Sequence, residues 1–158
     1  MRKFILLIFI PLLIKCGNRE TSSNVPDRKN IIASATKALQ DYYEDMRTNG
    51  MLAEFNWQDS SSDYFWVPPG YSGPISFDSV AKEIRRIALL VKKVDVRWEK
   101  LEVLPLTAEY VTYTGRLSST ITDRTGRTTT NRFLETGILV RKQNGWKLLC
   151  GQTGKLSD

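Results

Sequence analysis

Apolar residues recur at three- and four-residue steps in two stretches of the chain, which is the spacing of an amphipathic helix. The first stretch starts after Asp27, a residue type that caps helices, and stops at Asn49-Gly50; its apolar positions are Ile31, Ile32, Ala35, Leu39, Tyr42, Tyr43 and Met46. The second follows Ser76 and comprises Phe77, Val80, Ala81, Ile84, Ile87, Ala88 and Val91. A short helix over residues 51–57 is a third candidate.

Strand patterns fill most of the remainder. Residues 63–67 (DYFWV) predict a short strand that Pro68-Pro69-Gly70 ends. From Val94 onward apolar and charged residues alternate, and the alternation slips by one residue after Trp98, which predicts a bulge near Lys100. Turn signals at Pro105, at 123–126 (DRTG) and at Asn144-Gly145 then divide the chain into a four-stranded antiparallel meander. The expected fold class is α+β, with two or three N-terminal helices on one face of the sheet.

Pairing across these turns sorts the strand residues into two faces, because opposed residues share a face. The predicted helix-covered face consists of Val94, Val96, Trp98, Val111, Tyr113, Leu117, Leu134, Thr136, Ile138, Val140 and Leu149. The other face mixes charged with apolar groups, among them Phe133, Leu148 and, past the bulge, Leu101 and Val103. It is too apolar to face only solvent, so we expect it to meet a second copy of the chain. On that face Glu135 is expected to form an ion-pair row with Arg116 and Asp95.

The N-terminus carries a targeting pattern. Arg2 and Lys3 precede an apolar run over residues 4–14, which is shorter than the roughly 20 residues of a spanning helix, and Lys15-Cys16 follows it. This arrangement resembles a bacterial lipoprotein signal. It implies a signal peptide over 1–15, a lipidated Cys16, a flexible tether over 16–26 and a single domain over 27–158, held at the membrane of the cell envelope on its periplasmic or surface side. A secreted soluble protein with an incidental cysteine is the alternative.

Composition excludes several kinds of chemistry. The chain has 158 residues, enough for one domain, and no histidine, so it cannot form a Ser-His-Asp triad, a Cys-His dyad or a His-ligated metal site. Its formal net charge of +6 includes three basic residues of the leader, and no run of Lys or Arg exceeds two residues. We therefore expect no nucleic-acid binding. Carboxylates are not clustered and glycines are isolated, so no metal and no other cofactor is expected.

The order of these segments resembles a known family. The first helix, residues 65–70 (FWVPPG), the second helix, Val96-x-Trp98 and residues 144–148 (NGWKL) together resemble the SnoaL-like group of the nuclear transport factor 2-like superfamily. The resemblance implies a cone, in which a curved antiparallel sheet wraps around the helices and encloses a pocket, with frequent dimerisation through the outer sheet face. The superfamily includes isomerases, dehydratases and cyclases of polyketide or steroid-like substrates, beside members that only bind or assemble. Members often have a histidine where this chain has Gln152, which cannot exchange protons near neutral pH.

Five aromatic residues are the candidate ligand-binding set: Tyr43, Phe65, Trp66, Trp98 and Tyr113. The same side chains could instead fill an ordinary core. We expect the domain to bind a small apolar ligand or a partner protein without catalysis. The alternative is an isomerase or dehydratase with a carboxylate base and a tyrosine donor, for which Asp63, at the entrance of the first strand, is the candidate base. A third possibility is an assembly subunit whose pocket is filled.

Overall fold

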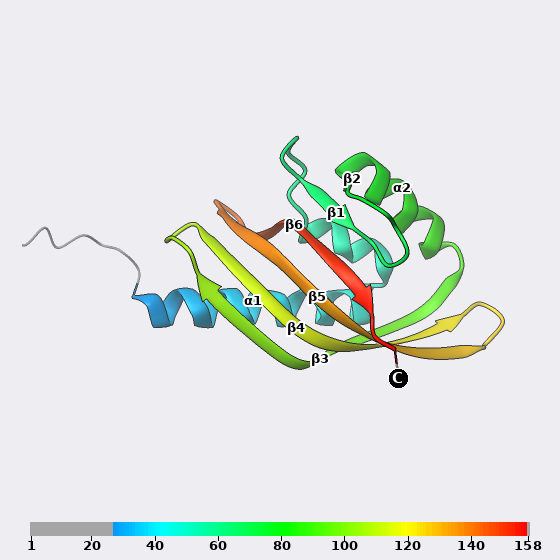
Figure 1. The fold of residues 1–158 in the computed structure, drawn as a ribbon. Helices are drawn as coiled ribbons and strands as arrows, with labels where there is room; N and C mark the ends of the chain where they lie inside the picture. The colour runs from blue at the N-terminus through cyan, green and yellow to red at the C-terminus, as the bar shows by residue number, and fades with distance from the viewer. Residues whose placement is uncertain (1–26, 158) are drawn as a thin grey trace, which may run out of the picture.

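The fold consists of a curved six-stranded sheet, one long helix, and two shorter helices (Figure 1). The computed structural model describes residues 27–157, so the predicted signal peptide 1–15 and tether 16–26, Cys16 included, lie outside the described residues. Helix α1 (Arg28–Asn49) begins at Asp27, whose carboxylate accepts a hydrogen bond from the Lys29 amide. It ends at Gly50, whose φ of 84° lies in the left-handed region that favours glycine. Both predicted ends of this helix are confirmed.

The remaining elements follow the predicted order, with two differences. These elements are a 3-10 helix η1 (Met51–Asn56), strands β1 (Phe65–Val67) and β2 (Ile75–Ser76), helix α2 (Phe77–Ala88), and strands β3 (Val91–Pro105), β4 (Tyr110–Asp123), β5 (Thr128–Lys142) and β6 (Gly145–Lys155). Strand β2 was not predicted, and Val91, predicted as the end of the second helix, begins strand β3 instead. The sheet order is β2-β1-β6-β5-β4-β3. The four-stranded meander is therefore confirmed. The pairing of β1 with β6 is parallel and joins distant segments, so the local pattern gave no sign of it.

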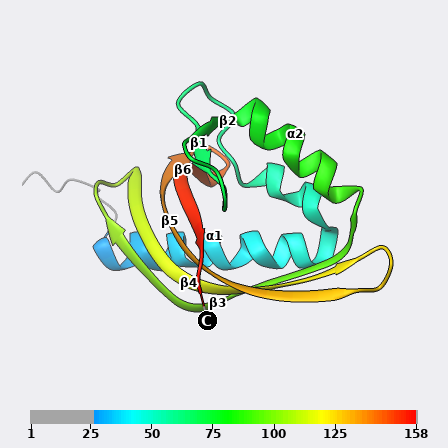
Figure 2. The same cartoon turned by 45° about the vertical axis from the view of Figure 1, so that its right-hand side comes forward.

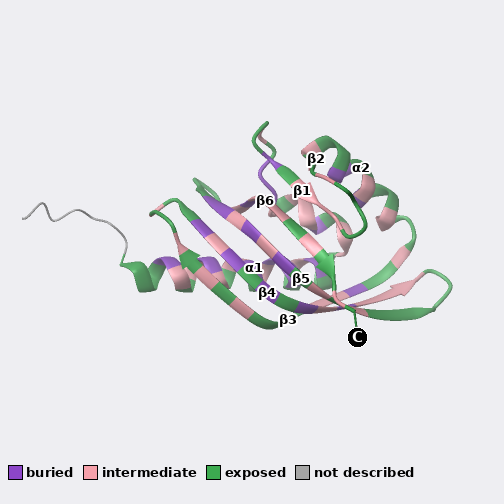
Figure 3. Ribbon diagram, in the orientation of Figure 1, coloured by how far each residue is buried: buried purple, intermediate pink, exposed green. Residues whose placement is uncertain are grey.

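The sheet bends around α1, while α2 and η1 lie toward the end of the fold that is opposite the start of α1 (Figure 2). The strands alternate between buried and exposed residues, as expected of a sheet with one covered face (Figure 3). The main core joins α1 to the inner face of the sheet, and a smaller cluster of Tyr64, Val80 and Ile84 lies under α2. None of the helices in residues 27–157 is long and apolar enough to cross a bilayer.

The register between β4 and β5 differs from the prediction. Glu135 pairs with Gly115, and Arg116 pairs with Leu134, so the expected Asp95, Arg116 and Glu135 row is wrong. The reason is the loop between the strands. The Asp123 amide donates to the Arg127 carbonyl at 3.0 Å, which leaves a three-residue loop with Gly126 at a φ of 92°. A loop with an odd number of residues shifts the register by one position, and that shift turns every β5 side chain to the opposite face.

Two β-bulges also change which side chains face the helix. The predicted bulge lies between Trp98 and Lys100 and is confirmed, but it keeps Leu101 and Val103 on the inner face, where they pack against the core. A second bulge sets Leu148 opposite Leu139 and Cys150 opposite Ile138. The inner face therefore includes Phe133, Glu135 and Leu148, whereas Leu134, Thr136, Ile138 and Val140 point outward. The inner face of the sheet is thus mainly apolar, and Glu135 is the buried carboxyl group that it carries.

Candidate functional site

The carboxyl group of Glu135 is the centre of the site. It lies on β5, only 5 % of the residue is exposed, and it accepts hydrogen bonds from three other elements. The Tyr43 hydroxyl of α1 donates to Oε2 at 2.9 Å, the Tyr113 hydroxyl of β4 donates to Oε1 at 2.9 Å, and the Thr153 hydroxyl of β6 donates to Oε2 at 3.1 Å. Trp66 Nε1 of β1 donates to the Thr153 oxygen at 3.1 Å. One carboxyl group thus connects α1 to β1, β4, β5 and β6.

Glycines next to this network leave space for its aromatic rings. A Cβ atom added at Gly151 of β6 would lie 2.6 Å from Trp66 Cζ3, and one added at Gly137 of β5 would lie 3.0 Å from Tyr113 Cε1. Either methyl group would collide with a ring or with the neighbouring backbone. The two glycines therefore let Trp66 and Tyr113 lie flat against the strands and reach their polar partners.

Burial dominates the proton affinities of these groups. It raises the pKa of Glu135, although the hydrogen bonds from Tyr43, Tyr113 and Thr153 oppose the shift. Burial and the neighbouring Glu135 together raise the pKa of Tyr43 and of Tyr113 well above the usual value of a phenol. Both tyrosines are consequently poor acids. Their hydroxyl protons are also directed at Glu135, so neither hydroxyl is free to donate to a bound molecule.

The structure brings four of the five predicted ligand-binding residues together. Trp98 packs between Tyr43 and Tyr113, with ring centroids 5.3 and 6.0 Å away, and its Nε1 donates to the Leu39 carbonyl. Trp66 joins the group through Thr153. Phe65 does not, because it follows the opposite alternation of β1 and lines a hollow on the outer sheet face with Cys150 and Gln152.

The predicted base and the glutamine at the family's histidine position lie outside this network. Asp63 is exposed in the turn that precedes β1. Gln152 is also exposed, opposite Val67 and Thr136. Sequence reasoning had considered Glu135 and assigned it to the wrong face. The signal that could have found it was the DRTG segment, since glycine at its fourth position is typical of a three-residue hairpin loop.

A groove of about 520 Å³ runs between α1 and β3 and reaches the network from outside. Tyr43 and Trp98 line its inner part. Its rim carries two ion pairs: Arg47 contacts Glu44 on α1, and Arg97 contacts Asp95 on β3 at 2.9 Å. The rings offer an apolar surface to a molecule in the groove, and the paired charges border its opening.

A second carboxyl group lies near the first. Glu54 of η1 is half-buried, and burial raises its pKa to about 7, with the charge of Glu135 adding to the effect. Gln58 Nε2 donates to Glu54 Oε1 at 2.8 Å, and Tyr42 supplies a further hydrogen bond. Glu54 therefore has a pKa near neutral pH. No three His, Cys, Asp or Glu side chains of residues 27–157 are grouped so that they could hold a metal ion.

These elements define an α+β cone in which a bent antiparallel sheet encloses a helix and one buried carboxyl group. The same fold occurs in solved structures of the nuclear transport factor 2-like superfamily. A candidate dehydratase of this family from Streptomyces avermitilis matches with a TM-score of 0.70 and 14 % identity, over 83 % of this chain and 99 % of that one. A superfamily protein from Salmonella enterica matches with a TM-score of 0.69 and 10 % identity, over 82 % and 94 % of the two chains.

A ketosteroid isomerase-like protein from Erwinia carotovora atroseptica is 19 % identical, with a TM-score of 0.62 over 80 % of this chain and 97 % of that one. No protein-family model matches the sequence, and no curated protein matches it either. At these identities the similarity shows the fold. The predicted cone is confirmed, and the chemistry depends on the residues of this chain.

Replacing Glu135 with alanine should destabilise the protein by about 3–5 kcal/mol, because two buried tyrosine hydroxyls and the partly buried Thr153 hydroxyl would lose their acceptor. Tyr43→Phe removes one donor and should cost about 1 kcal/mol. Urea denaturation measures both changes. Glu102→Ala is the matched control, since Glu102 is an exposed carboxylate paired with Lys100 at 2.6 Å; its denaturation midpoint should stay almost unchanged. Equal effects of the two glutamate replacements would contradict this role of Glu135.

The raised pKa of Glu54 predicts a pH-dependent stability. Between the usual glutamate pKa of 4.5 and the folded value of about 7, the folded chain holds a proton that the unfolded chain releases. The free energy of unfolding therefore falls as the pH rises through this interval, by roughly 1–3 kcal/mol from this group. Glu54→Gln should consequently be more stable, relative to the unmodified protein, at pH 8 than at pH 5. A stability difference that is the same at both pH values would exclude the shifted pKa.

Proposed function

We propose that this protein is a lipid-anchored envelope protein whose cone-shaped domain binds a small, apolar, ring-containing molecule without chemical turnover. The observation that carries the proposal is the direction of the Tyr43 hydroxyl. The Tyr43 ring lines the groove between α1 and β3, yet its hydroxyl donates to Glu135. The groove therefore offers aromatic surfaces for binding, while the polar groups behind it are occupied by one another. The segment order further supports a place in the SnoaL-like group.

Catalysis of the isomerase kind would need two free groups at the substrate: an unoccupied base and an acidic donor. Here both oxygens of Glu135 already accept hydrogen bonds, and the raised pKa of Tyr43 and Tyr113 makes them weak donors. Both features favour binding over proton transfer.

An isomerase or dehydratase is the second candidate. The specific observation in its favour is Glu54, because a carboxyl group with a pKa of about 7 can both accept and donate a proton near neutral pH. The similarity of fold to a candidate dehydratase and to a ketosteroid isomerase-like protein agrees with this candidate without establishing it.

The ketone 2-tetralone can distinguish the two candidates, because it has an aromatic ring and exchangeable protons beside its carbonyl group. We expect saturation-transfer NMR to detect its binding and the rate of proton exchange with D₂O to remain that of buffer alone. Gln40→Trp, which places a bulky ring in the groove at an exposed position, should abolish binding. Phe65→Ala is the control, since Phe65 is an aromatic residue of the outer face, and it should bind normally.

Faster exchange that is lost in Glu54→Gln would reject the binding proposal in favour of the enzyme. If Gln40→Trp still binds 2-tetralone, the ligand does not bind in this groove.

The anchor is proposed from the leader sequence alone, in which Cys16 follows the apolar run of residues 4–14. Bacteria that express the full chain and are fed radioactive fatty acid should label it, and Cys16→Ala should remove the label. A labelled Cys16→Ala chain would refute lipidation at this residue.

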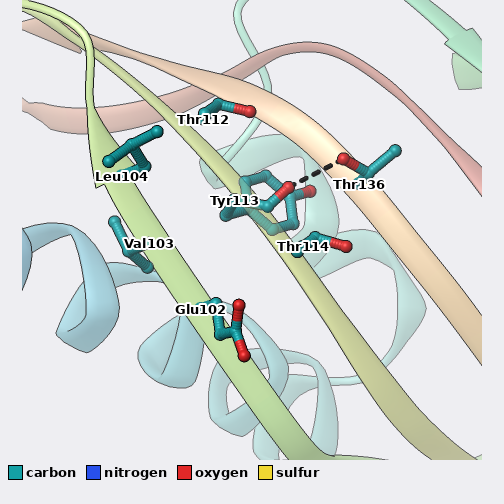
Figure 4. Close-up of a pocket in the computed structure, with 7 residues that line it drawn as sticks. All are labelled: Glu102, Val103, Leu104, Thr112, Tyr113, Thr114 and Thr136. Carbon is teal, nitrogen blue, oxygen red and sulfur yellow. Dashed lines mark hydrogen bonds between the residues drawn. The ribbon is translucent and has the colours of Figure 1, made fainter.

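We also propose that the domain forms a homodimer through its outer sheet face. This face carries exposed apolar side chains, among them Phe65, Leu104 and Leu134, at exposures of 44, 50 and 46 %. It is hollowed over β3, β4 and β5 by a cavity of about 580 Å³, where Thr136 of β5 donates to the Tyr113 carbonyl of β4 (Figure 4). Sedimentation equilibrium measures the association, which Leu134→Glu should weaken.

A further inference from the structure

Two segments that are distant in the sequence meet at one end of the molecule. The Arg124 amide in the β4–β5 loop donates to the Leu90 carbonyl at 3.0 Å, and the Arg124 guanidinium donates to the Leu89 carbonyl at 2.6 Å. The corner between α2 and β3 and the tip of the hairpin thus form one surface (Figures 1 and 2). We call residues 82–93 and 123–127 the distal tip, because they lie at the opposite end of the fold from the start of α1.

The distal tip exposes large apolar side chains. Leu89 is 71 % exposed and Leu90 is 56 % exposed, the two highest values among the exposed large apolar residues of the described chain. Leu52 of η1, at 52 %, borders the same end, where it lines a cavity of about 270 Å³ with Lys92 and Lys93. Adjacent leucines pointing into solvent at a corner have no role in the core described above.

The same surface holds the excess of basic over acidic residues in the described chain. The distal tip contains seven basic residues, namely Lys82, Arg85, Arg86, Lys92, Lys93, Arg124 and Arg127, against the two acidic residues Glu83 and Asp123. Both carboxylates are paired with arginines of the tip, at 2.8 Å for Arg86 and 3.4 Å for Arg127. The rest of residues 27–157 contains twelve basic and thirteen acidic residues. The basic excess of the domain is therefore concentrated where the leucines are exposed.

We propose that the distal tip binds the surface of an anionic phospholipid bilayer, with Leu89 and Leu90 inserted at the level of the headgroups and the surrounding lysines and arginines next to the phosphates. The exposed leucines and the basic side chains together favour this partner. Anionic lipid attracts each basic side chain, and the acyl boundary accepts the leucines. A nucleic acid would match the charges but would leave the leucines in water.

This contact goes beyond the proposed function and does not require Cys16. Helix α1, with 22 residues, is about 33 Å long and separates its own start from the distal tip. A lipid on Cys16 would hold the domain at one end, and the distal tip would be a separate attachment at the other. The two attachments can therefore be tested independently.

Co-sedimentation with vesicles tests the proposal on the chain from residue 27 onward, which contains every buried core residue described above. Vesicles of equal parts phosphatidylglycerol and phosphatidylcholine should bind it about tenfold more strongly than phosphatidylcholine alone, and added salt should weaken the binding. Leu89→Ser with Leu90→Ser, and separately Lys92→Glu with Lys93→Glu, should each reduce binding about tenfold or more. Circular dichroism verifies that each variant is folded.

Matched controls change the same residue types elsewhere. Leu106→Ser alters a leucine that is 53 % exposed at the β3–β4 turn, and Arg28→Glu with Lys29→Glu reverses charge at the start of α1. Both should bind as the unmodified chain does. Binding without preference for phosphatidylglycerol would overturn the proposal. So would control variants that lose as much vesicle binding as the leucine and lysine variants do. If the lysine variant binds vesicles more weakly but the leucine variant does not, the proposal is also overturned, since the partner would then be held by electrostatic attraction alone.

Discussion

A carboxyl group within an apolar interior remains there only if hydrogen-bond donors meet it, and the arrangement around Glu135 follows from this constraint. Donors arrive from α1, β4 and β6, and Trp66 of β1 supports the last of them. The helix therefore cannot slide along the sheet without separating Tyr43 from its acceptor. Apolar packing alone is less specific about position, so this polar contact fixes how the helix sits in the cone.

The same contact limits the chemistry. A site prepared for proton transfer leaves its base and its donor open toward the substrate, whereas here the tyrosines and the carboxylate satisfy one another. What remains exposed to the groove is the flat surface of Tyr43 and Trp98. Residue types alone, a carboxylate with tyrosines nearby, would indicate an enzyme. The direction of the hydroxyl groups supports the proposed binding function instead.

Local rules predicted much of the fold. The caps at Asp27 and Gly50, the stripe of α2 as far as Ala88 and the bulge beside Trp98 each depend on neighbouring residues, and the structure agrees with them. Non-local facts were missed: the parallel pairing of β1 with β6, and the register of β5. Tyr43, Trp66, Trp98 and Tyr113 lie together, because their strand and helix positions did not depend on that register, and their binding of a ligand stays a prediction. Glu135 did depend on it, and its face was therefore wrong.

The loop of Arg124, Thr125 and Gly126 is exposed, and exposed hairpin loops usually tolerate changes in length. This one should not. Removing or inserting a single residue there would exchange the two sides of β5, carrying Glu135 into solvent and Leu134 and Thr136 into the helix layer. Homologous chains that keep the buried carboxyl group should consequently vary this loop only in steps of two residues, a signature that a collection of related sequences would reveal.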